Sequence, residues 1–213
     1  MRPFIRTIET LELDGGALCL NFVNTVRSRF ETPFHEFLEK PSDWLLWINR
    51  IGLIDSQKQA LLNKYIEENS LKAEKELKRI FYVRELLYRL FREIARNKVP
   101  AEKDITLYNK VLSHSLRHLK IEFDKKIKIS ANWHVNSINL SCYLHPLIKS
   151  AYDLLISGNI ERLKECRHCG WIYLDKSKNN SRVWCNMKTC GNTEKTKKYY
   201  DKNKAVSVNK VVL

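Results

Sequence analysis

Four of the six cysteines of this 213-residue chain lie close together near its C-terminal end. They are Cys166, Cys169, Cys185 and Cys190, spaced as C-x2-C-x15-C-x4-C. Each close pair can bind one ion from a tight turn, and thiolates at such spacings are typical ligands of tetrahedral zinc. Four thiolates complete the coordination shell at about 2.3 Å each. The sequence therefore predicts one structural Zn²⁺ ion with no open position for catalysis.

The alternative to a zinc site is a set of unrelated buried thiols or a disulfide pair. The cellular compartment of the protein helps to decide between them, because it sets whether disulfides form. The first thirty residues carry acids and paired glycines and show no secretory signal. No apolar run approaches the roughly 20 residues that a membrane helix needs. We therefore expect a cytoplasmic protein with no membrane contact, where disulfides are disfavoured. Cys19 and Cys142 lie in apolar surroundings and are expected to be buried thiols.

Positive charge is concentrated around the cysteines. The whole chain has 38 Lys and Arg against 24 Asp and Glu, a net charge of +14. Residues 161–213 alone contain thirteen Lys or Arg and five Asp or Glu. A quarter of the chain thus carries more than half of the excess positive charge. Such a basic module is typical of nucleic-acid binding.

Local signals around the cysteines predict a treble-clef-like zinc finger. Gly170 follows the first pair, where a tight turn needs it, and residues 171–175 alternate as a strand would. The turn residues "NNSR" and the returning "RVWC" complete a hairpin between the two cysteine pairs. Asn192 or Thr193 then offers a cap for a helix that follows Cys190.

The preceding part of the chain shows mainly helical periodicity. Apolar residues recur at helical spacing in 41–52, 74–97, 104–119 and 144–158. Residues 118–134 alternate around Asp124 and predict a β-hairpin, and the stretch around Gly15 predicts a strand followed by the start of a helix. The expected fold class is α+β: a mostly helical domain with a small antiparallel β element at 1–160, then the finger at 161–213.

Both parts resemble a known family. The motif from Cys166 to Asn192 resembles the CGNR-type zinc finger, and "GGALCLNFVNTVRSR" with "WLLWINRIGLID" resembles the ABATE domain. The resemblance implies a stress-induced transcription regulator with a ligand-sensing N-terminal domain and a DNA-binding finger. It also implies that the four cysteines bind zinc and that the finger's signature falls on Asp175, Ser177, Arg182, Trp184, Gly191 and Asn192. Thr193 stands where the family has Arg, which removes a candidate bidentate contact.

The predicted partner is double-stranded DNA. Lys195, Lys198 and Lys202 fall on one side of the helix after Cys190 and are expected to contact phosphate. Arg182 and Asn192 are the candidates for base contacts. The alternatives are that the lysines form a solvated face and that Asp175 and Arg182 brace each other across the hairpin.

A second set of polar residues lies in an apolar setting near the N-terminus. Asn21, Asn24 and Arg27 are three residues apart, so a helix beginning here would align them on one side. They are candidates for binding a small-molecule effector, as the resemblance implies. The alternative is that they cap and brace the backbone near Gly15 and Gly16.

Other function classes find less support in the sequence. The chain has no nucleophile elbow, P-loop, dinucleotide-binding glycine motif or zinc-protease helix, so we do not expect an enzyme. His114 and His118 have a metal-binding spacing but are expected on an exposed polar face. A zinc finger that binds another protein without binding DNA is the alternative function. Dimerisation through the helical domain is expected to provide the specificity that one finger lacks.

Overall fold

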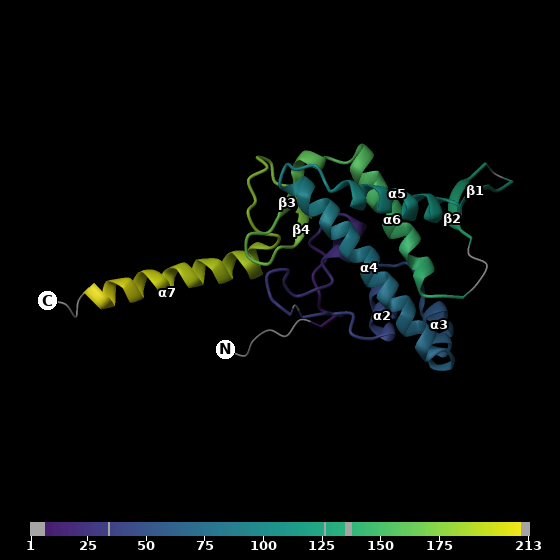
Figure 1. Ribbon diagram of the computed structural model, residues 1–213, viewed down its shortest axis with the longest axis horizontal. Helices are drawn as coiled ribbons and strands as arrows, with labels where there is room; N and C mark the ends of the chain where they lie inside the picture. Colours follow the sequence, from purple (N-terminus) through teal and green to yellow (C-terminus); the bar gives the residue numbers. More distant parts are fainter. Residues whose placement is uncertain (1–6, 34, 126, 135–137, 210–213) are drawn as a thin grey trace.

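The computed structural model describes residues 7–33, 35–125, 127–134 and 138–209, without the side chains of residue 157 and residues 202–209. Its elements are α1 (Leu18–Val23), α2 (Pro41–Arg50), α3 (Ser56–Glu68), α4 (Ser70–Ala95), α5 (Glu102–Leu116), β1 (Leu119–Phe123), β2 (Ile129–Trp133), α6 (Leu144–Ser157), β3 (Leu163–Glu165), β4 (Ile172–Leu174) and α7 (Asn192–Asn209). Two 3-10 turns, Ser141–Tyr143 and Ile160–Arg162, and a π-helical turn, Met187–Gly191, lie between them. Figure 1 shows a mostly helical body, as predicted. Within the described residues, no helix has the length and apolar character needed to cross a membrane.

The longest helix, α4, runs through the helical body (Figure 1). Its buried residues, among them Leu77, Ile80 and Leu87, recur at the helical period that the sequence shows. The helix contacts α1, α2, α3 and α5, and its C-terminal part contacts β3 and β4 beside the cysteines. Helix α4 therefore links the helical body to the cysteine region.

Four predicted helices are confirmed as α2, α4, α5 and α6. The sequence does not predict helix α3, because the helix buries only Leu62 and therefore has no apolar stripe. Its start had a signal, however, because the Asp55 side chain caps the helix by accepting from the backbone N–H of Lys58 at 2.7 Å. The strand expected before α1 is wrong: described residues 7–17 form turns and extended segments without a strand.

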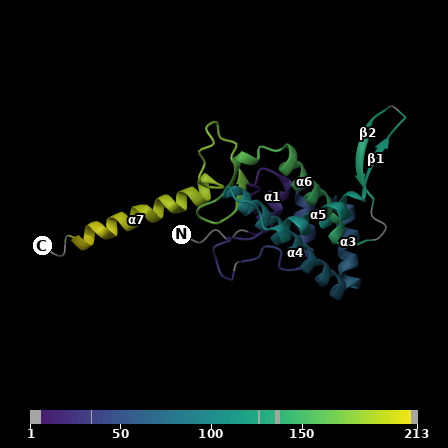
Figure 2. The same cartoon turned by 45° about the horizontal axis from the view of Figure 1, so that its top comes forward.

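The predicted hairpin in the helical domain is present as β1 and β2. The antiparallel register pairs Leu119 with Trp133 and Phe123 with Ile129, so apolar residues share one face. Figure 2 shows this hairpin standing away from the helices. Phe123 and Ile129 are accordingly 67% and 65% exposed, so the helical body does not cover this face.

One hydrophobic core crosses the predicted boundary at residue 160. Leu163, Trp171, Ile172 and Tyr173 belong to the same buried cluster as Phe22 and the other core residues of the helical body. A finger of about 50 residues has too little apolar surface to stabilise itself, and packing on a larger body supplies the missing burial. The two segments thus share one core, while the boundary itself stays a prediction.

A buried charge network joins α4 to the loop between α1 and α2. The Arg84 side chain is 1% exposed and donates two hydrogen bonds to the carboxylate of Glu36, both at 2.7 Å. It also donates to Glu85 at 2.9 Å, and Glu85 in turn accepts from Arg29 at 2.6 Å. Burial alone would lower the pKa of Arg84, but Glu36 and Glu85 outweigh it and raise that pKa. The guanidinium therefore stays charged inside the protein.

We expect Glu36→Gln to lower the free energy of unfolding by about 2–3 kcal/mol. Breaking a buried ion pair costs about 3–5 kcal/mol, and Glu85 still compensates part of the Arg84 charge. Urea denaturation of the zinc-loaded protein measures the change. Glu68→Gln is the matched control, because Glu68 forms an exposed pair with Lys64 at 3.8 Å and should cost less than about 0.5 kcal/mol. Equal losses for the two variants would contradict the stabilising role of this network.

Candidate metal centre and nucleic-acid interface

The first cysteine pair sits in a tight turn between β3 and β4. Strand β3 leads into Cys166, and β4 begins shortly after Cys169. The turn is closed by two backbone hydrogen bonds, from Gly170 N to Cys166 O at 2.9 Å and from Cys166 N to Trp171 O at 2.8 Å. Gly170 has φ +72°, and a Cβ there would lie 2.7 Å from Cβ of Arg29. Glycine is therefore required by both the backbone angle and the close packing.

The second pair sits at the root of α7. Cys185 precedes the π-helical turn Met187–Gly191, which contains Cys190. The Asn186 side chain caps this turn by accepting from the backbone N–H groups of Lys188 and Thr189. Helix α7 starts two residues after Cys190. The second pair therefore fixes the direction in which α7 leaves the protein.

The four sulfur atoms converge on one point. All lie within 4.8 Å of one another, and Cys185 Sγ is 3.6 Å from both Cys169 Sγ and Cys190 Sγ. Metal–sulfur bonds of about 2.3 Å in a tetrahedron place the sulfurs about 3.8 Å apart, close to these distances. All four cysteines are buried, and none is in a disulfide. The donor set fits one structural zinc ion.

The acid–base chemistry of the cluster also fits a cation. Hydrogen bonds among the buried sulfurs raise the pKa of Cys185 and Cys169 and lower that of Cys166 and Cys190. Four thiolates at these distances repel one another in a site with little water. A bound Zn²⁺ would compensate this repulsion and keep all four sulfurs deprotonated. Its chemistry here is structural, since the protein itself supplies the four ligands.

The hairpin predicted between the two cysteine pairs is wrong. Residues 175–184 form a loop, and β4 pairs instead with β3, which precedes the first cysteine. The loop is organised by Asp175, which accepts from the backbone N–H groups of Ser177 and Arg182. Lys164 pairs with the same carboxylate at 2.8 Å. Side-chain hydrogen bonds thus close this loop in place of a β-ladder.

Asp175 is fully buried and its role is structural. Burial alone would raise its pKa, but the Lys164 ammonium and the hydrogen bonds from Ser177 and Arg182 outweigh burial and hold the pKa well below its usual range. The carboxylate is therefore ionised across the physiological range. The expected brace between Asp175 and Arg182 exists, but it uses the backbone N–H of Arg182 and not its guanidinium.

Several contacts dock the first cysteine turn onto the helical body. Arg29 N donates to Cys169 O at 2.7 Å, and Trp171 Nε1 donates to Val26 O at 2.8 Å. Arg96 and Arg92, at the end of α4, pair with Glu165 of β3 at 2.7 and 3.6 Å. No motif in the sequence indicates these contacts, because hydrogen bonds to backbone carbonyls and ion pairs between distant segments depend on the tertiary fold.

The candidate effector residues occupy different local settings. Helix α1 ends at Val23, so Asn21, Asn24 and Arg27 are not aligned on one side of a helix. Asn21 accepts from the backbone N–H of Gly15, and exposed Arg27 lies 3.7 Å from Glu31. Asn24 is buried and makes two hydrogen bonds with the backbone of Ile172 in β4. The geometry favours the bracing alternative for Asn21 and Asn24.

The residues predicted to contact DNA occupy different settings. Arg182 stacks on Tyr173 at 4.9 Å, and its guanidinium donates to the backbone oxygens of Trp184 and Cys185. Asn192, at the start of α7, is exposed. Lys195 and Lys198 are exposed on α7, while the side chain of Lys202 lies outside the described part. Arg182 is therefore bound to the protein itself, and Asn192 and the two lysines face solvent.

Thr193, which replaces the Arg expected from the resemblance, lies in the first turn of α7. Its hydroxyl donates to the backbone oxygen of Thr189 at 2.9 Å. The neighbouring Glu194 contacts His168 Nδ1 at 2.7 Å, which ties α7 to the first cysteine turn. Thr193 therefore supports the junction of the π-helical turn and α7.

A buried four-sulfur centre, held by a tight turn and by the root of a helix, defines a zinc-finger protein. Residues 162–203 match the CGNR zinc finger. Residues 16–158 match the ABATE family, described as Putative stress-induced transcription regulator. Because this match covers more than half of the chain, the protein belongs to the ABATE family. A comparison with curated proteins gives no significant match.

We expect Cys166→Ser to lower the zinc content of the purified protein from one ion per chain to well below one. The hydroxyl is a poor substitute for a thiolate, and three sulfurs leave the shell incomplete. Zinc is measured with a chromogenic chelator after denaturation. Cys142→Ser is the control, because Cys142 lies outside the cluster and should leave the zinc content unchanged. Full zinc retention by Cys166→Ser would refute the assigned ligand set.

We expect Asn24→Ala to lower the free energy of unfolding by about 2–4 kcal/mol, since it leaves a buried N–H and a buried C=O of Ile172 without a partner. Urea denaturation of the zinc-loaded protein measures the loss. Asn132→Ala, at an exposed hydrogen bond on β2, is the matched control and should cost less than about 0.5 kcal/mol. A loss no larger than that of the control would show that Asn24 does not hold the finger on the body.

Proposed function

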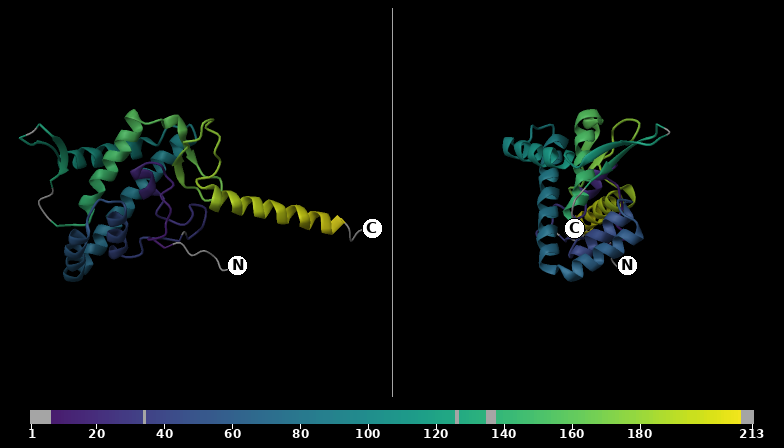
Figure 3. Two further views of the ribbon diagram at one scale, coloured as in Figure 1. Left: turned by 180° about the vertical axis from the view of Figure 1, so that it is seen from behind. Right: turned by 90° about the vertical axis from the view of Figure 1, so that its right-hand side faces the viewer.

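We propose that this protein is a DNA-binding transcription regulator and that α7 is its main DNA contact. The observation that carries the proposal is the position of α7, which projects from the metal centre into solvent as a single helix (Figure 3). Lys195, Lys197 and Lys198 are exposed along it, as are Tyr199 and Tyr200. Zinc ties the start of this helix to the protein through Cys190.

The composition of α7 supports binding to a negatively charged partner. Its first ten residues contain three Lys against Glu194 and Asp201, and Glu194 is already engaged with His168. A mostly polar helix gains little free energy from packing against its own protein, which leaves α7 accessible to a partner. Its 18 residues span roughly 27 Å, enough to follow a DNA groove or backbone. Phosphate contacts from its lysines would supply the affinity.

Specificity for a DNA sequence and regulation by an effector would depend on features other than α7. Asn192 remains the candidate for a base contact, whereas the Arg182 guanidinium is engaged with backbone oxygens. We propose a cytoplasmic, non-enzymatic protein that senses an effector with its helical domain. A homodimer would place two copies of α7 on neighbouring half-sites and raise specificity. The family description, which names transcription regulation, supports this function.

We expect the protein to bind random-sequence duplex DNA with a steep salt dependence that the α7 lysines carry. Lys195→Ala/Lys198→Ala should weaken binding and reduce the slope of log K against log salt by about 1.8, since each phosphate contact contributes about 0.9. Fluorescence anisotropy over a range of salt concentrations measures both effects. The matched control is Lys75→Ala/Lys78→Ala on α4, which removes the same charge at the same spacing from exposed positions of the body.

Two outcomes would contradict this proposal. If both double variants reduce the slope equally, overall charge and not α7 causes the binding. If the zinc-loaded protein does not bind DNA at low salt, α7 serves the alternative function of a protein-binding element. The zinc content of each variant is measured in parallel, so that loss of the metal is not mistaken for loss of a DNA contact.

A further inference from the structure

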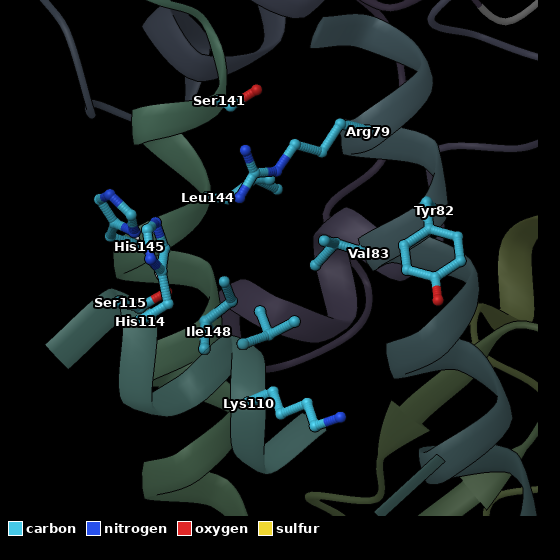
Figure 4. Close-up of a pocket in the computed structure, with 11 residues that line it drawn as sticks. Arg79, Tyr82, Val83, Lys110, His114, Ser115, Ser141, Leu144, His145 and Ile148 are labelled. Atoms are coloured by element: carbon cyan, nitrogen blue, oxygen red, sulfur yellow. Dashed lines mark hydrogen bonds between the residues drawn. The ribbon is translucent and has the colours of Figure 1, made fainter. Parts of the chain in front are cut away.

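A pocket lies among α4, α5 and α6, away from the metal centre and from the candidate effector residues Asn21, Asn24 and Arg27. Its volume is about 240 Å³. Figure 4 shows residues of all three helices and of the 3-10 turn at 141–143 around it. Sites for drug-sized ligands measure roughly 300–1,000 Å³. A pocket of this size therefore suits a smaller molecule, with one ring or a short chain.

The pocket combines apolar walls with positive charge. Val83, Val111, Leu144 and Ile148 contribute apolar surface from the three helices. The charged groups that line it are Arg79 and Lys110, and no Asp or Glu is among its described lining residues. An apolar interior with a cation at its edge suits a molecule that has an apolar body and one negative charge.

Arg79 differs from the other arginines of α4. Arg84, Arg89 and Arg92 each pair with a carboxylate of the protein. Arg79 has no such partner among the described residues, and its side chain reaches from α4 toward Leu144 of α6 (Figure 4). A planar guanidinium that is free to make two parallel hydrogen bonds matches the geometry of a carboxylate.

One polar atom in the wall of the pocket has no protein partner among the described residues. Ser141 Oγ is buried without a hydrogen-bond partner in the described residues. Buried polar groups in native proteins normally have a partner, so this hydroxyl calls for one. His114 lies at the exposed side, and the buried ring of His145 contacts Ser115 Oγ at 3.1 Å.

The histidines of the pocket are held in their neutral form near neutral pH. Burial first, and then the neighbouring His118, His114 and Arg79, lower the pKa of His145 to about 4. Burial and Arg79 likewise lower the pKa of His114. Adding a proton here is opposed mainly by burial and, to a smaller extent, by the positive charge of Arg79, which a bound anion would offset.

We propose that this pocket binds a small monocarboxylate with an apolar body and that Arg79 is the partner of its carboxylate. An effector role for such a ligand rests on the proposed regulator function. The link would be α4, which lines the pocket and also carries Arg92 beside Glu165 of the finger. The binding itself does not rest on that function. A direct binding measurement therefore separates a failure of this inference from a failure of DNA binding.

The test is isothermal titration of the full zinc-loaded protein with acetate, hexanoate and benzoate, each compared with its neutral amide. We expect hexanoate or benzoate to bind at least tenfold more tightly than the matching amide, and acetate to bind weakly because it lacks the apolar body. Arg79→Gln should weaken binding of the acid about tenfold, the effect of losing one charge-assisted contact. Lys78→Gln is the control, because Lys78 is the preceding residue of α4, has the same charge and does not line the pocket.

Histidine-selective NMR localises the site. We expect the ring signals of His114 and His145 to shift on addition of the bound acid, while those of His168 in the finger do not. The proposal is overturned if no acid binds at millimolar concentrations, if acid and amide bind equally, or if Arg79→Gln and Lys78→Gln bind alike. It is also overturned if the shifts occur at His168 and not at the pocket.

Discussion

The structure depends on the way the first cysteine turn is held against the segment that follows α1. Arg29 N binds the carbonyl of Cys169, Trp171 binds the carbonyl of Val26, and Asn24 binds both backbone groups of Ile172. These hydrogen bonds are mostly buried and join residues about 140 positions apart in the chain. Each would leave a buried polar group unpaired if the finger moved away. The metal centre and the helical domain are therefore built as one unit.

Helix α4 is the element that makes this unit rigid. Its N-terminal half packs in the helical body, its middle holds the Arg84 charge network, and its C-terminal end pairs with Glu165 beside Cys166. An α-helix of 26 residues extends about 39 Å, so α4 spans the distance from the helical body to the finger. The pocket beside Arg79 lies along the same helix.

In contrast, α7 and the β1–β2 hairpin extend from the body (Figures 1 and 2). Helix α7 is basic and polar, whereas one face of the hairpin is apolar and largely exposed. The body thus fixes the starting points of these elements without covering them. At α7 a zinc ion would fix the starting point of the helix, because Cys190 connects the helix root to three sulfurs from elsewhere in the finger. Loss of the metal would release the orientation of α7 even where its helical propensity remained.

The sequence by itself determined the zinc ligands and most of the helices. Cysteine spacing identifies a tetrahedral site because both pairs are local, and the apolar period of α4 needs no knowledge of its neighbours. Tertiary structure decided which strands pair around the first cysteine turn. It also decided that the Arg182 guanidinium binds backbone oxygens of the finger and that Asn24 joins the finger to the body. The pocket also arises only when α4, α5 and α6 meet. These features depend on hydrogen bonds and packing between distant segments, which no local periodicity or spacing encodes.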